Sequence, residues 1–202
     1  MKRLLIGLLA TLVSTTGYSQ EVEPQKEAFF TGEDLSLWQV PPNNTWWSVE
    51  GGVLHVKNDP ELLGSILWTK AEFTDFMVEL EFKFGEGTID SGIFMRGDDE
   101  HNPQIQIGES GSLKRDMTAS PYVPKSGYPV EAEGVKELLR LKDWNTIKAM
   151  AKGNEYRVWL NGKEVMNYQM EDANLKGAVG LQLHPGREMT IQFKNIFITR
   201  LK

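Results

Sequence analysis

The sequence of 202 residues contains no cysteine. This absence excludes disulfide bonds, and it also removes the residue that a lipoprotein signal needs for acylation. The stability of the folded chain therefore depends on the burial of apolar side chains. Nine Phe and six Trp, within a composition that is 40% hydrophobic, supply enough apolar volume for such a core.

The sequence also lacks an apolar run of the roughly 20 residues that a membrane-spanning helix requires. A shorter run at residues 4–13 follows Lys2 and Arg3 and precedes small and polar residues. This order is typical of a secretory signal peptide. We expect residues 1–19 to be removed on export, which leaves a periplasmic or secreted protein without a membrane anchor. Residues 28–202 then have the length of one domain.

The sequence has fewer basic than acidic residues. The sequence has 22 Lys and Arg against 28 Asp and Glu, so the formal net charge is −6. No cluster of basic residues offsets this balance, and a nucleic-acid-binding surface is therefore not expected. A small neutral or cationic ligand fits the charge better.

Helical periodicity is nearly absent. Only residues 135–143 (VKELLRLKD), with Gly134 before them, place apolar residues on one helical side. The dominant pattern is alternation with period two, clearest in FMVELEFKF at residues 76–84. An antiparallel strand with one buried face has this pattern. Its charged residues, Glu79, Glu81 and Lys83, are expected to be solvated.

Further strands are expected at residues 53–56, 65–70, 91–96, 103–107, 144–152, 155–160, 178–184 and 189–200. Asn161-Gly162 predicts a tight hairpin turn, because both residues tolerate positive φ. Short strands separated by turn residues indicate an all-β sandwich or barrel, here with one short helix. Residues 108–133 contain three Pro and are expected to form a long loop, a feature that is often functional.

Several expected strands place planar polar or aromatic groups on the face opposite their apolar residues. These outward positions hold Arg96, Gln104, Gln106, Arg157, Trp159, Gln182 and His184. Amide, guanidinium and imidazole groups hold their donors and acceptors in fixed planes that match sugar hydroxyls and carbonyls, and aromatic faces stack on sugar C–H surfaces. The second face is therefore expected to bind a small-molecule carbohydrate.

The alternative is an ordinary wetted sheet face, because half-solvated antiparallel sheets are common. For His184, a structural role at the end of a strand is an alternative to a catalytic one. Most other Trp residues are expected in the core by default. The adjacent Trp46 and Trp47 must point in opposite directions in an extended chain, and we assign Trp47 to the ligand.

Motifs of several enzyme classes are missing. The sequence has no HExxH, no Gly-x-Ser-x-Gly and no P-loop, and three His give little support for zinc. A retaining glucanase needs two carboxylates about 5 Å apart, and the strand at residues 103–107 carries amides where such acids would sit. No cofactor is expected. A divalent cation is the alternative, with oxygen ligands drawn from Asp90, Asp98, Asp99, Glu100 and Glu109, which lack EF-hand spacing.

Seven segments occur in a fixed order along residues 28–202. They are FTGEDLSLWQV, WWSVEGGVL, LWTKAEFTDFMVELEFKF, DSGIFMRG, IQIGESGSL, DWNTIKAMAKGNEYRVWLNGKEV and GLQLHPGREMTIQFKNIFI. This set resembles the 3-keto-disaccharide hydrolase family, which is common among exported bacterial proteins. The resemblance implies an all-β, concanavalin A-like jelly-roll sandwich of two antiparallel sheets with a ligand cleft on the concave sheet. It also implies an activity on glycosides oxidised at C3, either hydrolysis or elimination of the aglycone with hydration of the glucal.

A C3 ketone acidifies the C2 proton, so a base can form an enolate and the C1 substituent can leave by β-elimination. The site then needs one base, groups that stabilise the enolate, and an acid for the leaving group. Our hypothesis assigns acid-base roles to His184 or Glu109 and enolate stabilisation to Arg96 and Lys125. The remaining candidate sugar contacts are Gln104, Gln106, Gln182, Trp47 and Trp159.

Of these candidates, Arg96, Gln106, Gln182 and His184 stand at positions that match family motifs. Many relatives carry Glu where this chain has Gln104, so a carboxylate role does not transfer to that position. The leading interpretation is an exported enzyme that cleaves 3-keto-glycosides. A non-catalytic carbohydrate-binding module is the alternative, because one fold serves both classes, and a conventional glycosidase is a third.

Overall fold

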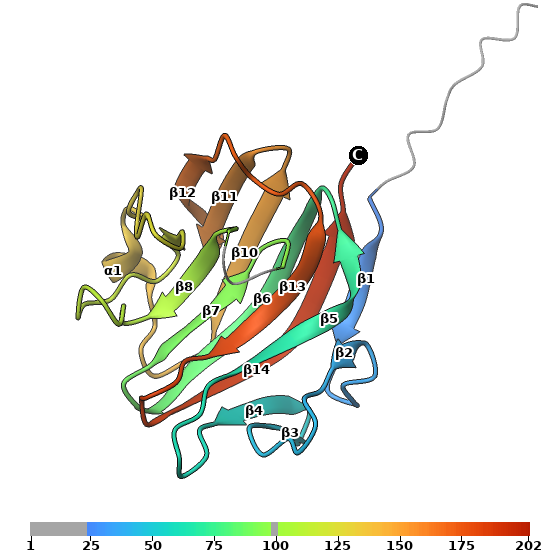
Figure 1. The fold of residues 1–202 in the computed structure, drawn as a ribbon, viewed down its shortest axis with the longest axis vertical. Helices are drawn as coiled ribbons and strands as arrows, with labels where there is room; N and C mark the ends of the chain where they lie inside the picture. Colours follow the sequence, from blue (N-terminus) through green and yellow to red (C-terminus); the bar gives the residue numbers. More distant parts are fainter. Residues whose placement is uncertain (1–23, 98–100) are drawn as a thin grey trace, which may run out of the picture.

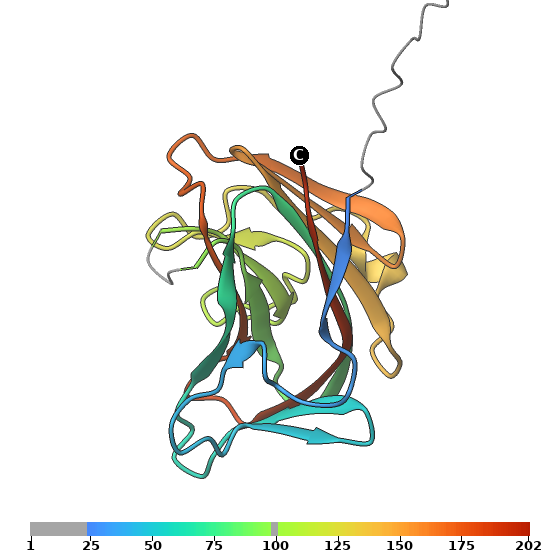
Figure 2. The same ribbon diagram turned by 90° about the vertical axis from the view of Figure 1, so that its right-hand side faces the viewer.

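The computed structural model describes residues 24–97 and 101–202. Its fourteen strands form two antiparallel sheets packed face to face, and one short helix connects two of the strands (Figures 1 and 2). This architecture confirms the all-β class, the two antiparallel sheets and the single short helix. The expected signal peptide and the acidic residues 98–100 lie outside the described residues. Within the described ranges, no helix is long and apolar enough to span a membrane.

The first sheet, here called sheet A, has eight strands. One path through it runs β12 (Lys163–Gln169), β11 (Glu155–Leu160), β10 (Asn145–Lys152), β6 (Phe76–Gly87), β14 (Met189–Arg200), β4 (Val53–Lys57) and β3 (Trp47–Glu50). Strand β1 (Lys26–Phe30) also pairs with β14. The first and last strands of the domain therefore lie side by side, as Figure 2 shows.

The second sheet, sheet B, has six strands in the order β2 (Trp38–Gln39), β5 (Ser65–Phe73), β13 (Gly177–Leu183), β7 (Asp90–Phe94), β8 (Gln104–Gly108) and β9 (Pro121–Tyr122). Strand β13 comes late in the sequence but inserts between β5 and β7. Because of this insertion, Gln182 on β13 lies in one row with Gly92 on β7 and Gln106 on β8.

The core lies between the two sheets, and the alternation seen in the sequence decides which side chains enter it. From β6, the side chains of Phe76, Val78, Leu80 and Phe82 are fully buried. On the outer face of the same strand, Glu79 forms ion pairs with Lys26 and Lys148. The buried side of sheet B is formed by Leu67, Ile93, Ile105, Ile107, Leu181 and Leu183.

Each strand expected from the alternation is present, and the turn at Asn161 and Gly162 has the predicted positive φ values of 49° and 87°. Strands β1, β2, β3 and β9 were not expected, and their segments of two to five residues show no clear alternation of apolar and polar residues. Strand β9 lies within the expected loop at residues 108–133, which also forms isolated bridges at Glu109–Asp116 and Val123–Gly127.

The helix α1 (Val135–Leu138) has a single turn, so the predicted continuation to residue 143 is wrong. Side-chain amides take the hydrogen bonds that a longer helix would make. Asn161 Nδ2 donates to the Leu138 carbonyl, and Asn145 Oδ1 accepts from the backbone N–H of Arg140. Leu139 is already extended, with φ of −70° and ψ of 126°.

Candidate functional site

The outer face of sheet B carries two adjoining hollows. The first, here called the polar hollow, has a volume of 460 Å³ and contains Asp90, Gln106, Tyr128, His184 and Arg187 in its lining. The second, the aromatic hollow, has a volume of 590 Å³ and contains Trp68 and Phe94. Both are lined by Gln104, Tyr122, Gln182 and Pro185. The two hollows therefore adjoin along these four residues, and together they are here called the cleft.

A glycine on the central strand lets the amide side chains meet. A Cβ atom at Gly92 would lie 2.1 Å from Gln104 Nε2, so any other residue would collide with that side chain. Gln104 crosses β7 at this point and donates to Gln182 Oε1 at 2.5 Å. Within residues 24–97 and 101–202, Gln104 Oε1 and Gln182 Nε2 have no hydrogen-bond partner, so an acceptor and a donor stay available for a ligand hydroxyl.

Asp90, the first residue of β7, supplies a buried carboxylate at the base of the polar hollow. Its residue is 2% exposed, and Oδ1 accepts a hydrogen bond from Gln106 Nε2 at 2.9 Å. Oδ2 lies 3.1 Å from Arg187 Nε, in an ion pair that lacks hydrogen-bond geometry. Burying a charge is costly unless it is paired, so Arg187 compensates Asp90. Arg187 Nη1 also donates to Glu109 Oε1 at 3.1 Å.

His184 follows the last residue of β13 and brings an imidazole to the same carboxylate. Its Nδ1 lies 2.7 Å from the carbonyl oxygen of Pro185, which can only accept a hydrogen bond. Nδ1 therefore carries the proton in the neutral ring, and Nε2 presents a lone pair. Nε2 lies 3.9 Å from Asp90 Oδ2, and the side chain is 36% exposed. This geometry gives the hollow an accessible proton acceptor.

Gly111 lies over the point where these three groups meet. A Cβ atom at this position would lie 3.1 Å from Asp90 Oδ2, 3.6 Å from Arg187 Nη2 and 3.8 Å from His184 Nε2. The missing side chain therefore keeps open the space that carboxylate, guanidinium and imidazole share. The distances to Arg187 and His184 are ordinary van der Waals contacts, whereas the 3.1 Å approach would force Asp90 to move.

Tyr128 closes one side of the polar hollow. Its hydroxyl donates to Gln106 Oε1 at 3.2 Å, and its ring lies 5.3 Å from that of Tyr122. Burial of the phenol, reinforced by the negative charge of Asp90, raises the pKa of Tyr128 from 10.0 to about 12. Tyr128 therefore stays protonated at neutral pH and acts as a hydrogen-bond donor.

The structure brings five of the predicted site residues together. Gln104, Gln106, Gln182 and His184 line the polar hollow, and Glu109 reaches it through its hydrogen bond to Arg187. Four others lie elsewhere.

Arg96 does not face the ligand cleft, so the predicted placement is wrong. Its φ of 61° turns the chain after β7 and ends the alternation on which the prediction depended. The residue is 1% exposed. Its guanidinium donates to the carbonyls of Thr74 and Gly153 and pairs with Asp75 at 3.0 Å. Arg96 therefore joins three turns of the sandwich and has no reach to the hollow.

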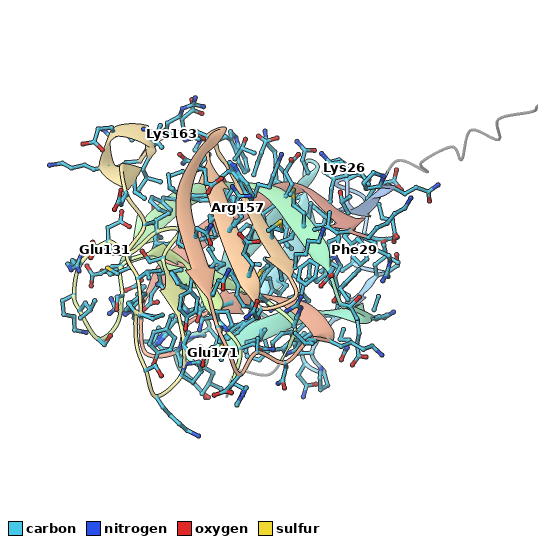
Figure 3. All side chains as sticks on the ribbon, turned by 90° about the horizontal axis from the view of Figure 1, so that it is seen from above. Lys26, Phe29, Glu131, Arg157, Lys163 and Glu171 are labelled. Atoms are coloured by element: carbon cyan, nitrogen blue, oxygen red, sulfur yellow. The ribbon has the colours of Figure 1, made fainter. Side chains whose placement is uncertain are left out.

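Trp47, Trp159 and Lys125 also lie outside the cleft. Trp47 is 3% exposed in the core, where its Nε1 donates to Ser65 Oγ. Trp159 packs under Arg157 on the outer face of sheet A, and the outer faces of two packed sheets point in opposite directions. Figure 3 labels Arg157 on β11, the strand that also carries Trp159. Lys125 is exposed, with φ of 70°, in the turn between Val123 and Gly127.

The sequence reasoning assigned Asp90 only to the alternative cation site, and it did not assign Trp68, Arg187 or Tyr128 to the cleft. Asp90 stands two positions before Gly92 and four before Phe94, so the alternation of β7 already placed it on the outer face. Trp68 was assigned to the core, although in β5 it alternates with the buried Leu67. Arg187 and Tyr128 lie in loops, where no periodic signal exists.

The fold is a jelly-roll sandwich with a polar hollow on the outer face of one sheet. Residues 25–199 match the model of the 3-keto-alpha-glucoside-1,2-lyase-like domain, and the chain belongs to that family. Comparison with curated proteins gives no match.

Solved structures similar to this chain include a glycosyl hydrolase candidate and a carbohydrate-binding module. A candidate glycosyl hydrolase from Parabacteroides distasonis has a TM-score of 0.68 and 18% identity, over 88% of this chain and 94% of that chain. The carbohydrate-binding module CBM66 from Bacillus subtilis has a TM-score of 0.60 and 16% identity, over 81% of this chain and 96% of that chain. At such identities the likeness shows the fold alone, and it confirms the predicted concanavalin A-like sandwich. With the family match, it indicates a glycosyl hydrolase-like or carbohydrate-binding protein.

Proposed function

We propose that this protein cleaves glycosides whose sugar ring carries a ketone at C3, and that the polar hollow is the active site. One observation carries the proposal: the lone pair of His184 Nε2 and the Asp90–Arg187 ion pair converge on one open point under Gly111. A base beside a buried cation is what proton removal next to a ketone requires. The family match supports the substrate class.

In the proposed reaction, His184 Nε2 accepts the C2 proton, and the electrons of the C2–H bond form the C2=C3 double bond of an enolate. Arg187 stabilises the negative charge on the C3 oxygen. The ketone reforms as the C1–O bond breaks, which leaves a double bond between C1 and C2. The departing oxygen takes the proton from the imidazolium, so one proton moves from C2 to the aglycone. Addition of water across C1=C2 then gives the free 3-keto sugar.

The remaining residues position these groups. Asp90 lies 3.9 Å from His184 Nε2 and stabilises the imidazolium that forms after proton transfer. Gln106 and Glu109 each hold a partner in place, Gln106 through Asp90 and Glu109 through Arg187. Arg187 thus takes the role that was predicted for Arg96. Gln104 and Gln182 offer their unpaired amide atoms to sugar hydroxyls.

A non-catalytic carbohydrate-binding module is the second candidate. The hydrogen-bonded amide pair and the likeness to CBM66 favour it. A conventional glycosidase has less support, because the two carboxylates near the hollow, Asp90 and Glu109, both contact the same guanidinium. A glycosidase needs one of its carboxyl groups to donate a proton and the other to act as a nucleophile or base.

Export and a divalent cation remain proposals. The pattern at residues 1–19 supports export to the periplasm or the medium. Within the described part of the chain, no group of three or more His, Asp and Glu side chains is arranged to hold a metal ion. Asp98, Asp99 and Glu100 lie outside that part, so EDTA treatment of the active protein is the direct test of a cation requirement.

The experiment is an NMR time course with methyl 3-keto-glucoside and, separately, with the unoxidised methyl glucoside, each with and without EDTA. We expect the anomeric signal of the keto substrate to disappear and that of the unoxidised substrate to persist. Saturable binding of the keto substrate without loss of its anomeric signal would favour the carbohydrate-binding module. Cleavage of the unoxidised glucoside would favour the conventional glycosidase.

A further inference from the structure

The aromatic hollow lies next to the proposed active site, and the reaction proposed above places no part of the substrate in it. Its floor is formed by Trp68 on β5 and Phe94 on β7, whose ring centroids lie 5.3 Å apart with planes at 42°. Phe94 is 5% exposed and supports Trp68, which is partly exposed. Among the residues that the structure describes, no charged side chain lines this hollow. Its chemistry therefore differs sharply from that of the polar hollow, which contains Asp90 and Arg187.

A glycine fixes the position of the Trp68 ring. Gly180 on β13 pairs with Trp68 across the sheet, and a Cβ atom there would lie 2.6 Å from both Cε3 and Cζ3 of the indole. The ring therefore rests directly on the backbone of β13. The same kind of bare position, at Gly92, lets Gln104 reach Gln182. At each glycine the missing Cβ atom leaves room for a side chain from a neighbouring strand, Gln104 at Gly92 and Trp68 at Gly180.

The hydrogen-bonded pair of Gln104 and Gln182 forms the boundary between the hollows, because both amides line both of them. A ligand that crosses this boundary places one end among the charged groups and the other against the aromatic rings. The acid-base chemistry can take place only at the charged end. The uncharged end is suited to a group that does not react but presents an apolar face.

We propose that the aromatic hollow is the subsite for the leaving group, and that Trp68 stacks on a ring attached at C1 of the keto sugar. This inference rests on the proposed function, because the polar hollow determines which end of the ligand reacts. The ligand class is an uncharged ring with an apolar face, supplied by a second hexose or by an aromatic aglycone. A glycoside with a small aglycone leaves the hollow empty and gains nothing from Trp68.

The test compares kcat/KM for methyl, phenyl and glucosyl 3-keto-glucosides with the wild-type protein, Trp68→Ala and Trp159→Ala. Loss of one stacking contact corresponds to about a tenfold decrease. We expect this decrease with Trp68→Ala for the phenyl or the glucosyl substrate, and a change below about twofold for the methyl substrate. A loss with phenyl alone assigns the hollow to aromatic aglycones, and a loss with glucosyl alone assigns it to sugars. Trp159→Ala, on the opposite face of the molecule, should match the wild type.

An equal loss on all three substrates, or no loss on either ring-bearing substrate, would overturn the subsite. Gly180→Ala is a second variant that displaces the indole without removing it, and it should show the same substrate-dependent loss. If the wild-type protein turns over none of the substrates, the proposed function fails. Calorimetric titration of phenyl and methyl 3-keto-glucoside into wild type and Trp68→Ala then still tests the subsite: tighter binding of the phenyl ligand that depends on Trp68 supports it, and equal affinities reject it.

Discussion

His184 Nε2 lies 3.9 Å from Asp90 Oδ2, at the meeting point of β13 and β7. The Pro185 carbonyl holds the other ring nitrogen and thereby fixes which nitrogen is the acceptor. The carboxylate is in turn held by Gln106 and Arg187. A proton acceptor with a fixed tautomer beside a carboxylate is the centre of the proposed mechanism.

Replacing His184 and Glu109 in separate variants shows which of the two acts as the acid-base residue. General acid-base groups contribute about 10²- to 10⁴-fold, so we expect His184→Ala to lower kcat by that amount on a 3-keto-glycoside. Glu109→Gln keeps an oxygen that can accept from Arg187, and its effect should stay below about tenfold. Steady-state kinetics of the two variants provide the measurement. A larger loss with Glu109→Gln than with His184→Ala would transfer the role to the glutamate.

Gly111→Ala tests the open point of the hollow. The new Cβ would lie 3.1 Å from Asp90 Oδ2, and we expect kcat/KM to fall more than about tenfold as the carboxylate and substrate are displaced. Gly111 does not have a positive φ, so the melting temperature should change little. Gly51→Ala is the matched control: its φ is 58° and open space surrounds it, so it should cost stability and leave activity intact. Full activity in Gly111→Ala would show that the substrate does not enter this space.

Arg96→Ala is expected to damage stability. Removal of the buried guanidinium leaves the carbonyls of Thr74 and Gly153 without this donor and Asp75 without its cation, and the cost should be about 3 kcal/mol. Arg157→Ala, which breaks a partly exposed ion pair with Glu164, should cost less than about 1 kcal/mol. Urea denaturation measures both values. An Arg96→Ala protein of normal stability with a selective loss of kcat would restore the catalytic role first given to this residue.

Tyr128 makes stability depend on alkaline pH. Its folded-state pKa of about 12 lies above the ordinary value of 10.0, so its contribution is complete below pH 10 and is lost as the pH rises through about 12. Burial also raises the pKa of Tyr156 and Tyr168, which add to the decrease. We expect Tyr128→Phe to lose less stability than the wild type between pH 10 and 12, measured by urea denaturation at each pH. Identical pH dependence in the two proteins would contradict the raised pKa.

The period-two pattern was sufficient to predict which side chains share a face. Gln104 with Gln106, and Gln182 with His184, follow from the pleat alone. Alternation within one strand carries no information about neighbours, so the insertion of β13 between β5 and β7 could not be predicted from it. The pattern also failed at Arg96, because β7 ends at Phe94 and Arg96 itself has a left-handed φ of 61°.

Loop residues were beyond the reach of the pattern for a different reason. Arg187 and Tyr128 enter the hollow through contacts with residues distant in sequence, Glu109 and Gln106 respectively. No local periodicity or turn signal marks such contacts. Trp68 shows the opposite case, since the alternation around Leu67 pointed to the outer face but the general preference of Trp for the core outweighed it.

The most direct test of the mechanism is the fate of the C2 hydrogen of methyl 3-keto-glucoside when the reaction runs in D₂O. Elimination followed by hydration removes this hydrogen as a proton, so the wild-type protein should yield a 3-keto sugar with deuterium at C2, or a glucal without hydrogen there. The rate should exceed an enzyme-free control and should be lost in His184→Ala. Cleavage of the C1–O bond with the original C2 hydrogen fully retained would contradict the account.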